Sequence, residues 1–232
     1  MALTPNNIFT RVADTLQDVG NVRWTSTELL RYLNDGRREL ALNKPDIYSE
    51  HSSIALVAGT KQSIPSDGNT FIDAIRNYSS SDVVGRVVRL VEREVLDAQN
   101  PDWHSTTATT SIINFMFDER SPKTFYVYPP ASGGGHKLEI LYSKSPVDIS
   151  SSDLDSTTAL AKEDLHTNTL YDYILYRAYS KDAEYTGNAQ RAVTHFNLFA
   201  SSIGIDKRMK YVSSPNVANQ SGVPPKEAGA DA

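Results

Sequence analysis

The sequence contains no cysteine, which excludes disulfides, thiolate metal sites and cysteine nucleophiles. It also lacks the uninterrupted apolar run of about 20 residues that a membrane-spanning helix needs. Its first residues show no basic stretch followed by an apolar one, so we expect no signal peptide. These absences predict a protein that contacts no membrane and is made and kept in the cytoplasm, or in an assembly built there.

Basic residues are not in excess either. The chain has 23 lysines and arginines against 28 acidic residues, and its formal net charge is −5. Proteins that read a nucleic-acid sequence normally carry a basic patch. The charge balance therefore argues against that class of protein.

Motifs that carry chemistry are scarce. The five histidines, at positions 51, 104, 136, 166 and 195, are scattered and have no second ligand at the spacing of a metal site. Gly133-Gly134-Gly135 lacks the helix and the Lys-Ser/Thr of a phosphate-binding loop. Asp118 and Glu119 belong to a turn, and any pairing with other carboxylates depends on the fold. We therefore assign no catalytic residue, metal or cofactor, and expect that the protein is not an enzyme.

The strongest helical pattern lies between residues 164 and 204, which we interpret as two helices in tandem separated at Gly187-Asn188. The second helix carries a single apolar stripe. It is expected to end at Gly204, because glycine commonly closes a helix in the left-handed conformation. The stripe consists of Ala189, Ala192, Val193, Phe196, Phe199, Ala200 and Ile203.

The first of these two helices has two unlike faces. One is apolar and includes Leu170 and Ile174 at helical spacing. The other is aromatic and consists of Tyr173, Tyr176 and Tyr179, which about 100° per residue turns away from the apolar face. Tyrosine is enriched at protein–protein contacts. The rings either contact a second subunit or cover the protein's own β segment, and the sequence favours neither.

Two further helices precede this region. Thr4-Pro5 supplies the N-cap and first position of a helix that we expect to end at Gly20. Thr25 and Glu28 fit a capping box, in which each side chain accepts the other residue's backbone N–H. Gly36 interrupts the second helix. It marks either the close approach of another backbone or a tolerated glycine that costs about 1 kcal/mol.

From about residue 52 the apolar pattern changes to alternation, which is typical of strands. Residues 54–64 predict a hairpin that turns at Ala58-Gly59. The helices on either side of this segment are expected to pack into one bundle, with the β segment inserted between them and a flexible C-terminal tail after it. The predicted fold class is α+β. Further strands are expected at 71–78, 85–91, 113–117, 125–130 and 138–142, with a short helix at 92–98.

This order of elements divides the chain into four parts. We expect the N-terminal helices of the bundle in residues 1–50 and the β-rich segment with its short helix in residues 51–150. The C-terminal helices of the bundle follow in residues 151–209, and an extended arm in residues 210–232. The arm is rich in serine, proline, asparagine, glycine and alanine, and such a segment buries too little apolar surface to order itself in water. It is either a loose end or an arm that orders on a partner.

Mixed charges flank the aromatic face and mark a candidate subunit interface. They either belong to a solvated surface, where a pair contributes little, or fix the register between neighbours in a ring. Trp103 follows a proline in a loop and is either a core anchor of the β segment, which we favour, or a contact on the tail side. The candidate interface comprises Tyr173, Tyr176, Tyr179, Arg177, Lys181, Glu184, Arg37 and Arg38.

Four stretches resemble the head-to-tail adaptor (connector) proteins of tailed bacteriophages, in the form found in short-tailed phages. Asn100-Pro101-Asp102-Trp103 and Tyr176-Arg177-Ala178-Tyr179-Ser180-Lys181-Asp182-Ala183-Glu184 are the most specific motifs. The resemblance covers about residues 5 to 205 and leaves out the terminal tail. The four stretches lie within 23–46, 89–103, 125–130 and 176–185.

The resemblance implies a structural protein of the virion. Adaptors of this kind form a dodecameric ring below the portal protein, lengthen the DNA channel and carry the tail tube or nozzle. Double-stranded DNA would pass through without sequence recognition, which suits an acidic chain. The resemblance also implies that the C-terminal arm reaches along the portal. Its candidate portal-binding residues are Tyr211, Val212, Pro215, Val217, Val223, Pro224 and Pro225.

Two other functions remain open from the sequence. One is a helical peptide-binding scaffold, because Ala178, Ala192 and Phe196 loosely match the helix pairs of tetratricopeptide repeats. The absence of a second copy at a period near 34 residues counts against it. The other is a carbohydrate-directed module that uses Trp103 and the carboxylates of the β segment.

Overall fold

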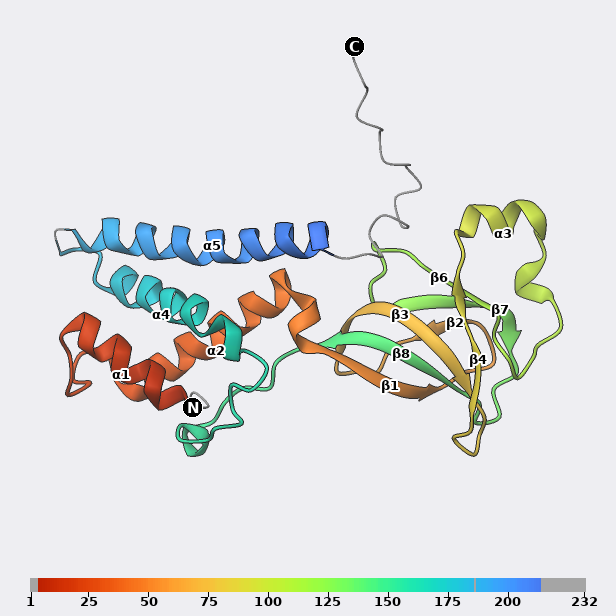
Figure 1. Cartoon of the computed structure of the whole chain (residues 1–232), viewed down its shortest axis with the longest axis horizontal. Coiled ribbons are helices and arrows are strands. Elements are labelled where there is room, and N and C mark those ends of the chain that lie inside the picture. Colours follow the sequence, from red (N-terminus) through yellow and green to blue (C-terminus); the bar gives the residue numbers. More distant parts are fainter. Residues whose placement is uncertain (1–3, 186, 214–232) are drawn as a thin grey trace, which may run out of the picture. The chain divides into compact units, whose positions relative to one another are not determined.

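The computed structural model describes residues 4–185 and 187–213. In this part of the chain, α-helices and two four-stranded sheets give an α+β fold, as predicted. The chain forms two compact units (Figure 1). One consists of Met1–Lys44 and Ile149–Ala232, as far as these residues are described, and the other of Pro45–Asp148. Each unit is described by itself below.

The first unit is helical. It contains α1 (Pro5–Leu16), α2 (Ser26–Asn43), α4 (Thr167–Lys181) and α5 (Asn188–Ser213), with short 3₁₀ turns at Ser151–Asp153 and Asp164–His166. Helix α4 contacts the other three helices and lies between α2 and α5 (Figure 1). Two contacting faces explain why its sequence is apolar on more than one side. Its buried side chains include Leu170, Ile174 and Leu175, all of which are fully enclosed.

Capping side chains set the starts of α1 and α2. Thr4 and Asn7 form a complete capping box, in which each side chain accepts the other's backbone N–H at 3.2 and 2.9 Å. The Thr25 hydroxyl accepts the N–H of Glu28 at 3.3 Å, as predicted. The predicted reciprocal bond, in which the Glu28 carboxylate accepts the backbone N–H of Thr25, is wrong. The carboxylate instead accepts hydrogen bonds from Tyr32 and from Lys181 in α4. A tertiary ion pair has replaced the local bond.

Two predicted helix ends differ in the structure. Helix α1 ends at Leu16 rather than at Gly20, and Gln17 takes the left-handed cap conformation with φ 57°. Helix α5 continues past Gly204 to Ser213, so the predicted stop at Gly204 is wrong. Open space surrounds that glycine, so the structure gives no steric need for it.

Gly36 lies where α2 meets α4. A Cβ atom at this position would sit 2.8 Å from Cδ1 of Tyr173 and 3.4 Å from Cδ2 of Leu170. The close approach predicted at Gly36 therefore exists, but an aromatic side chain makes it rather than a second backbone. The ring of Tyr173 fills the space that a side chain on α2 would need.

Buried polar contacts connect α2 with the return of the chain at residue 149. The Asn34 amide donates to the carbonyl of Ile149 and accepts its N–H, both at 3.0 Å. One turn further along α2, Arg37 Nε donates to Oε1 of Glu163 at 2.7 Å. Both charged groups are almost fully enclosed, so removal of either one would leave a buried charge without this partner.

The second unit contains two antiparallel-rich sheets with the strand orders β1-β8-β3-β4 and β2-β7-β6-β5. Helix α3 (Arg93–Gln99) lies where a short helix was predicted, and 3₁₀ turns occur at Pro45–Tyr48 and Trp103–Ser105. The strands of the first sheet are β1 (Ser49–Ala55), β8 (Lys137–Lys144), β3 (Gly68–Tyr78) and β4 (Val84–Val87). Those of the second are β2 (Gly59–Ser63), β7 (Thr124–Ala131), β6 (Asn114–Phe117) and β5 (Arg89–Leu90).

The predicted hairpin at residues 54–64 is wrong. Strand β1 pairs with β8 and strand β2 with β7, so the two strands belong to different sheets. The Gln62 side chain holds the connection by bonding to the backbone N–H and carbonyl of Val57 at 2.9 and 2.7 Å. Alternation identified both segments as extended, but it carries no information on which strand each one pairs with.

The single strand predicted at residues 85–91 is also wrong, because this segment divides between the sheets as β4 and β5. β4 pairs with β3 of the first sheet, and β5 pairs in parallel with β6 of the second. Val88 between them is buried at 5% exposure. The Asn77 amide holds the chain where it passes from the first sheet to the second. It donates to the carbonyls of Arg86 and Ile112 and accepts the N–H of Ile112.

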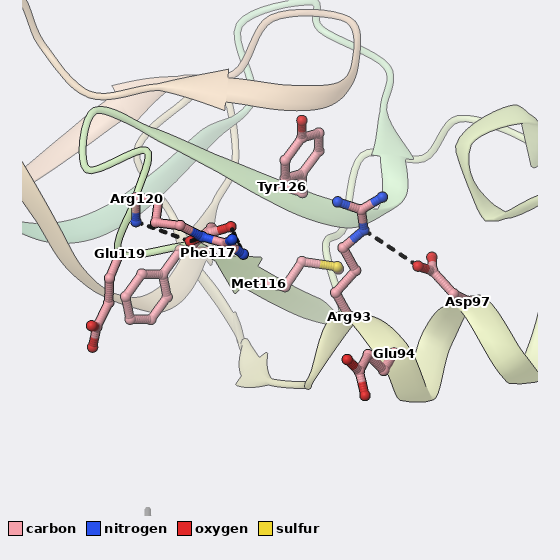
Figure 2. Close-up of a pocket in the computed structure, with 9 residues that line it drawn as sticks. Arg93, Glu94, Asp97, Met116, Phe117, Glu119, Arg120 and Tyr126 are labelled. Atoms are coloured by element: carbon pink, nitrogen blue, oxygen red, sulfur yellow. Dashed lines mark hydrogen bonds and ion pairs between the residues drawn. The ribbon is translucent and has the colours of Figure 1, made fainter.

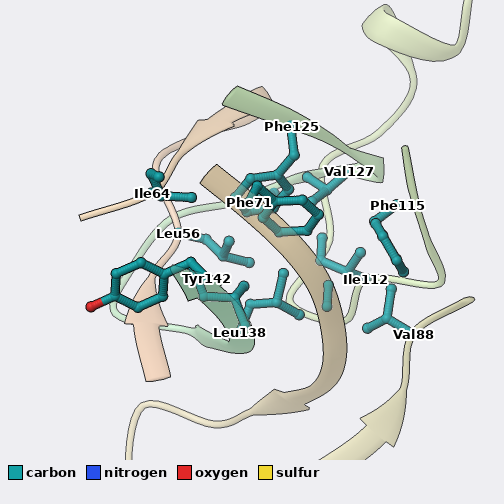
Figure 3. Close-up of a cluster of buried hydrophobic side chains, with 13 residues drawn as sticks. Leu56, Ile64, Phe71, Val88, Ile112, Phe115, Phe125, Val127, Leu138 and Tyr142 are labelled. Carbon is teal, nitrogen blue, oxygen red and sulfur yellow. The ribbon is translucent and has the colours of Figure 1, made fainter. Parts of the chain in front are cut away.

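A single apolar core joins the two sheets of this unit (Figure 3). Phe71 of β3 stacks on Phe125 of β7 with 4.4 Å between ring centroids, and it meets Phe115 of β6 edge-on at 5.8 Å. Leu138 and Ile140 of β8 complete the layer and are fully enclosed. The inward residues alternate with outward ones along β7 and β8, as expected for packed sheets.

Candidate functional site

The aromatic face of α4 packs on α5 within the same chain. Tyr173 contacts Phe199 with 5.1 Å between ring centroids, and Tyr176 contacts Phe196 at 5.2 Å. Tyr179 stacks on His195 at 5.7 Å with 15° between the ring planes. The face therefore covers α5, a neighbour that the sequence analysis did not consider, rather than the β segment.

Hydrogen bonds add to this helix pair. His195 Nδ1 lies 3.0 Å from the Asp172 carboxylate, and the hydroxyls of Thr169 and Ser202 are 3.0 Å apart. These contacts fix the register of α5 along α4. Tyr173 and Tyr179 are buried at 5% and 6% exposure, so little of either ring is left for a second subunit. Tyr176 is only half-buried and retains accessible surface.

An apolar groove runs along one flank of the α4–α5 pair. Its volume is about 330 Å³, and its floor and walls are almost entirely apolar. Val193 and Phe196 of α5 remain 52% and 45% exposed at its edge. We call this feature the α4–α5 groove. It is lined by Tyr176, Ser180, Ala183, Ala189, Ala192, Val193 and Phe196.

The outward surface of α5 between residues 188 and 204 is nearly free of charge. Between residues 188 and 204, Arg191 is the only arginine, lysine or acidic residue, although such residues make up 22% of the chain. The exposed positions carry uncharged polar groups, such as Gln190, Thr194 and Asn197. Depletion of charge around aromatic and aliphatic groups is typical of the centre of a protein–protein interface.

The predicted interface charges have different surroundings. Arg37 is enclosed and bonded to Glu163, which places it inside the helical unit. Arg38 is exposed and lies 3.3 Å from Asp35. Glu184 is exposed just beyond the end of α4.

Two further predicted charges hold α2 against α4. Lys181 bonds to Glu28 at 2.7 Å and to the carbonyl of Arg23 at 3.1 Å. Arg177 donates to the Tyr173 hydroxyl at 3.3 Å and lies over the ring of Tyr32 at 5.3 Å. Both side chains keep more than a third of their surface in solvent. An interface role for these charges stays a prediction.

The loop between α1 and α2 is a feature that the sequence analysis missed. The Asp18 carboxylate accepts the backbone N–H groups of Val22, Arg23 and Trp24 at 2.9–3.0 Å. The N–H of Trp24 is the main cause of a lowered Asp18 pKa. Aspartate side chains commonly stabilise turns by bonding nearby backbone N–H groups, but Asp18 reaches four to six residues ahead, and a single aspartate gives no distinctive sequence signal for that.

The same loop is fastened to α4. Trp24 Nε1 donates to the carbonyl of Ala178 at 3.3 Å, and Arg23 Nε donates to the Asp182 carboxylate at 2.8 Å. Held in this way, the loop presents Val19 and Val22 to solvent at 75% and 85% exposure. We call residues 17–24 the valine loop.

A hollow of the β unit lies between α3 and the β6–β7 connection (Figure 2) and has a volume of about 640 Å³. Two of its four carboxylates are paired with arginines, since Arg93 lies 3.3 Å from Asp97 and Arg120 lies 3.0 Å from Asp118. The hydrogen bond from Arg120 lowers the pKa of Asp118, which makes this carboxyl a poor proton donor. Glu119 points away from the α3 residues (Figure 2).

Trp103 is buried at 1% exposure and anchors the core of the β unit beside α3. Its indole N–H donates to the Asp97 carboxylate at 2.7 Å, and its ring stacks on His104. A sugar-binding platform needs an exposed aromatic face, which Trp103 does not offer. The described residues also contain no group of three histidine, aspartate or glutamate side chains arranged to hold a metal ion.

The candidate portal-binding arm falls mostly outside the described residues. Tyr211 and Val212 belong to the last turn of α5, and the structure describes only their backbone. Pro215, Val217, Val223, Pro224 and Pro225 lie outside the described part of the chain. Along the residues that are described, no helix has the length and apolar character to cross a membrane.

The model of the SU10 adaptor protein family matches residues 5–219. The chain belongs to this family. A comparison with individually curated protein sequences gives no significant match. Membership makes the chain a head-to-tail adaptor of a tailed bacteriophage and a structural component of the head–tail connection. The match includes all the helices and strands described above and extends beyond residue 205, where the resemblance noted in the sequence stopped.

Two surface features of the helical unit are candidate binding surfaces of an adaptor. A head-to-tail adaptor has to contact proteins of both the head and the tail. The α4–α5 groove and the valine loop are the described apolar features of this unit with a defined shape and large exposed side chains. In the β unit, the hollow beside α3 is the candidate binding surface.

Proposed function

We propose that this adaptor forms a dodecameric ring between the portal protein and the tail tube or nozzle of a short-tailed phage, and that the ring lengthens the DNA channel. The family match over residues 5–219 carries the proposal. The helices of residues 1–50 and 151–209 act as one bundle that packs side by side around the ring. The β-rich segment of residues 51–150 is inserted in this bundle.

The subunit interface is proposed on α4 and α5. Its support is the nearly charge-free outer surface of residues 188–204 of α5 beside an apolar groove. Tyr176 contributes directly, whereas Tyr173 and Tyr179 hold α5 in place from beneath. Arg38, Arg177, Lys181 and Glu184 lie at the edge, where charges set orientation more than affinity. Arg37 supports the interface from within the unit through its bond to Glu163.

The proposed ring sits in the virion and passes double-stranded DNA without reading its sequence. A net charge of −5 supports this role, because like charge disfavours contact with phosphate. The C-terminal arm of residues 210–232, including Tyr211, Val212, Pro215, Val217, Val223, Pro224 and Pro225, is proposed to bind the portal.

No enzymatic activity is part of the proposal. Two carboxylates of the hollow beside α3, those of Asp97 and Asp118, are paired with arginines, and Trp103 is enclosed. These observations remove the support for the carbohydrate-directed module. The hollow is instead available for a tail-side contact.

The test is the mass and negative-stain image of the protein, alone and mixed with the portal ring of its own phage. A twelve-fold collar on the portal supports the proposal. A protein that stays monomeric and does not bind the portal contradicts it. Deletion of the residues after Ser213 then asks whether the C-terminal arm carries the portal contact, since the collar should be lost while α5 is kept.

A further inference from the structure

The α4–α5 groove and the valine loop lie on opposite faces of α4. Trp24 and Arg23 of the loop contact Ala178 and Asp182. Ser180 of the groove lies two residues from Ala178, and at about 100° per residue this separation is roughly half a turn. The loop therefore cannot reach the groove of its own chain without unpacking α4 from its neighbours.

The two features also match in chemistry. The groove is an apolar hollow of about 330 Å³ rimmed by Val193 and Phe196. The loop presents two exposed valines. Single exposed apolar residues are common on protein surfaces, but two in one rigidly held loop are unfavourable for solubility. Three N–H bonds to Asp18 already hold the loop in shape. Binding would therefore order little additional chain, which lowers its entropic cost.

We propose that the valine loop of one adaptor subunit inserts Val19 and Val22 into the α4–α5 groove of the next subunit. The proposal rests on the ring assembly proposed above and names the contact that joins its members. Because the loop and the groove are on opposite faces, every copy uses its loop toward one neighbour and its groove toward the other. Such a heterologous contact generates a closed ring when the rotation between copies closes.

The chain's own C-terminal residues are a less suitable occupant. Phe196 and Ser213 are 17 residues apart on α5, which places the helix end about 26 Å from this part of the groove. The residues that follow Ser213 begin at that distant end. A segment from there would have to run back along the full length of the helix before it reached the groove.

Site-specific crosslinking tests the contact directly, because the chain has no cysteine of its own. Val22→Cys and Val193→Cys are prepared as separate proteins, mixed, assembled with portal rings and treated with a short bismaleimide. The mixture should give covalent dimers, and each protein alone should not. Leu165→Cys mixed with Val193→Cys is the control, since Leu165 is exposed on the same unit but belongs to neither feature.

The double variant V22C/V193C sharpens the result. A heterologous contact predicts a ladder of covalent oligomers, whereas a two-fold symmetric contact stops at dimers. Rings that assemble normally but crosslink no better than the Leu165 control overturn the insertion and leave the proposed function standing. If no oligomer forms with or without the portal, both proposals fail.

Charge insertion gives a second readout. Val193→Asp and Val22→Asp, at exposed positions, should each keep the helical circular dichroism of the parent protein and lower the assembled fraction about tenfold or more. Leu165→Asp adds the same charge on the helical unit outside both features, and Val57→Asp adds it on the β unit. Equal assembly by the groove variant and its Leu165 control would contradict the proposal.

Discussion

Asn34 in α2 binds the backbone of Ile149 with both ends of its amide, at 3.0 Å for each hydrogen bond. The contact joins residues 115 positions apart and lies where the chain re-enters the helical unit after the β unit. A buried asparagine in this position completes the hydrogen bonding of a backbone segment that has no sheet partner.

Replacement of this amide should be strongly destabilising. In Asn34→Leu, the N–H and carbonyl of Ile149 lose their partners in a buried place, and each orphaned group costs about 1–3 kcal/mol. We expect the free energy of unfolding, measured with urea, to fall by at least about 2 kcal/mol. Asn43→Leu is the matched control, because Asn43 is on the same helix but bonds only to Glu39 in its own last turn. A similar loss in both variants would mean that the Ile149 clamp is not the cause.

Gly36 and Gly204 form a second matched pair for substitution by alanine. Alanine favours a helix over glycine by about 1 kcal/mol. At Gly204 nothing lies within 4 Å of the new methyl group, so Gly204→Ala should be stabilising. At Gly36 the methyl group would meet the Tyr173 ring at 2.8 Å, and overpacking of this kind costs about 1–3 kcal/mol.

Gly36→Ala should therefore lower the midpoint of thermal unfolding, whereas Gly204→Ala should raise it. Because Tyr173 also packs on Phe199, the clash should be transmitted to α5 and reduce amide-exchange protection there. A rise in stability for both alanine variants would show that the ring moves aside freely.

Local signals in the sequence predicted much of the fold. The caps at Thr4 and Thr25, the short helix α3 and the strand at β3 all depend on residues within a few positions of one another. Periodicity and capping report such local preferences reliably. The predicted end of α5 at Gly204 was wrong because a glycine in an open helical position need not stop the helix.

Pairing between distant segments could not be predicted in the same way. β1 and β2 were identified as extended, yet their partners β8 and β7 are decided by the packing of two sheets. The partner of the tyrosine face was also missed. The spacing of Phe196 and Phe199 on α5 contained a signal for it, since it matches the spacing of the α4 tyrosines.

The interface role of the candidate residues stays a prediction. Aromatic enrichment singled out one face of α4, but the burial of Tyr173 and Tyr179 depends on α5 lying against them. The low charge of residues 188–204 was visible in the sequence and is typical of the centre of an interface. The valine loop had no such signal, because it depends on a single carboxylate that bonds three N–H groups.

Tyr32 should make stability sensitive to alkaline pH. Burial, followed by its hydrogen bond to Glu28, raises the pKa of Tyr32 to about 12. Between the ordinary tyrosine pKa of about 10 and this value, the unfolded chain has lost the proton and the folded chain still holds it. The unfolded state then binds fewer protons, so stability falls as pH rises through this window.

Tyr32→Phe removes this titration. Its free energy of unfolding should decline less steeply than that of the parent protein between about pH 10 and 12, although it loses the bond to Glu28 at every pH. Urea unfolding at a series of pH values measures the difference. Parallel curves for the two proteins would show that Tyr32 does not contribute to the alkaline decline.

Asp18 should make stability sensitive to acid pH, with the free energy of unfolding falling as the pH is lowered. The N–H of Trp24, with those of Val22 and Arg23, stabilises the carboxylate and lowers its pKa below the ordinary value. A group whose pKa is lower in the folded state contributes stability that is present above the unfolded pKa of about 4 and is lost as pH falls through the folded one. Asp18→Asn should therefore flatten the acid side of the stability curve, because asparagine does not titrate.

The same substitution also connects loop order with assembly. Asparagine keeps one carbonyl oxygen, so it can accept the N–H of Val22 or of Trp24 but no longer holds both sides of the loop with a charged group. Amide exchange of residues 22–24 should become faster in Asp18→Asn, and assembly on the portal should weaken without a change in the helical signal. If exchange accelerates while assembly is unchanged, the order of the valine loop does not matter for the contact between subunits.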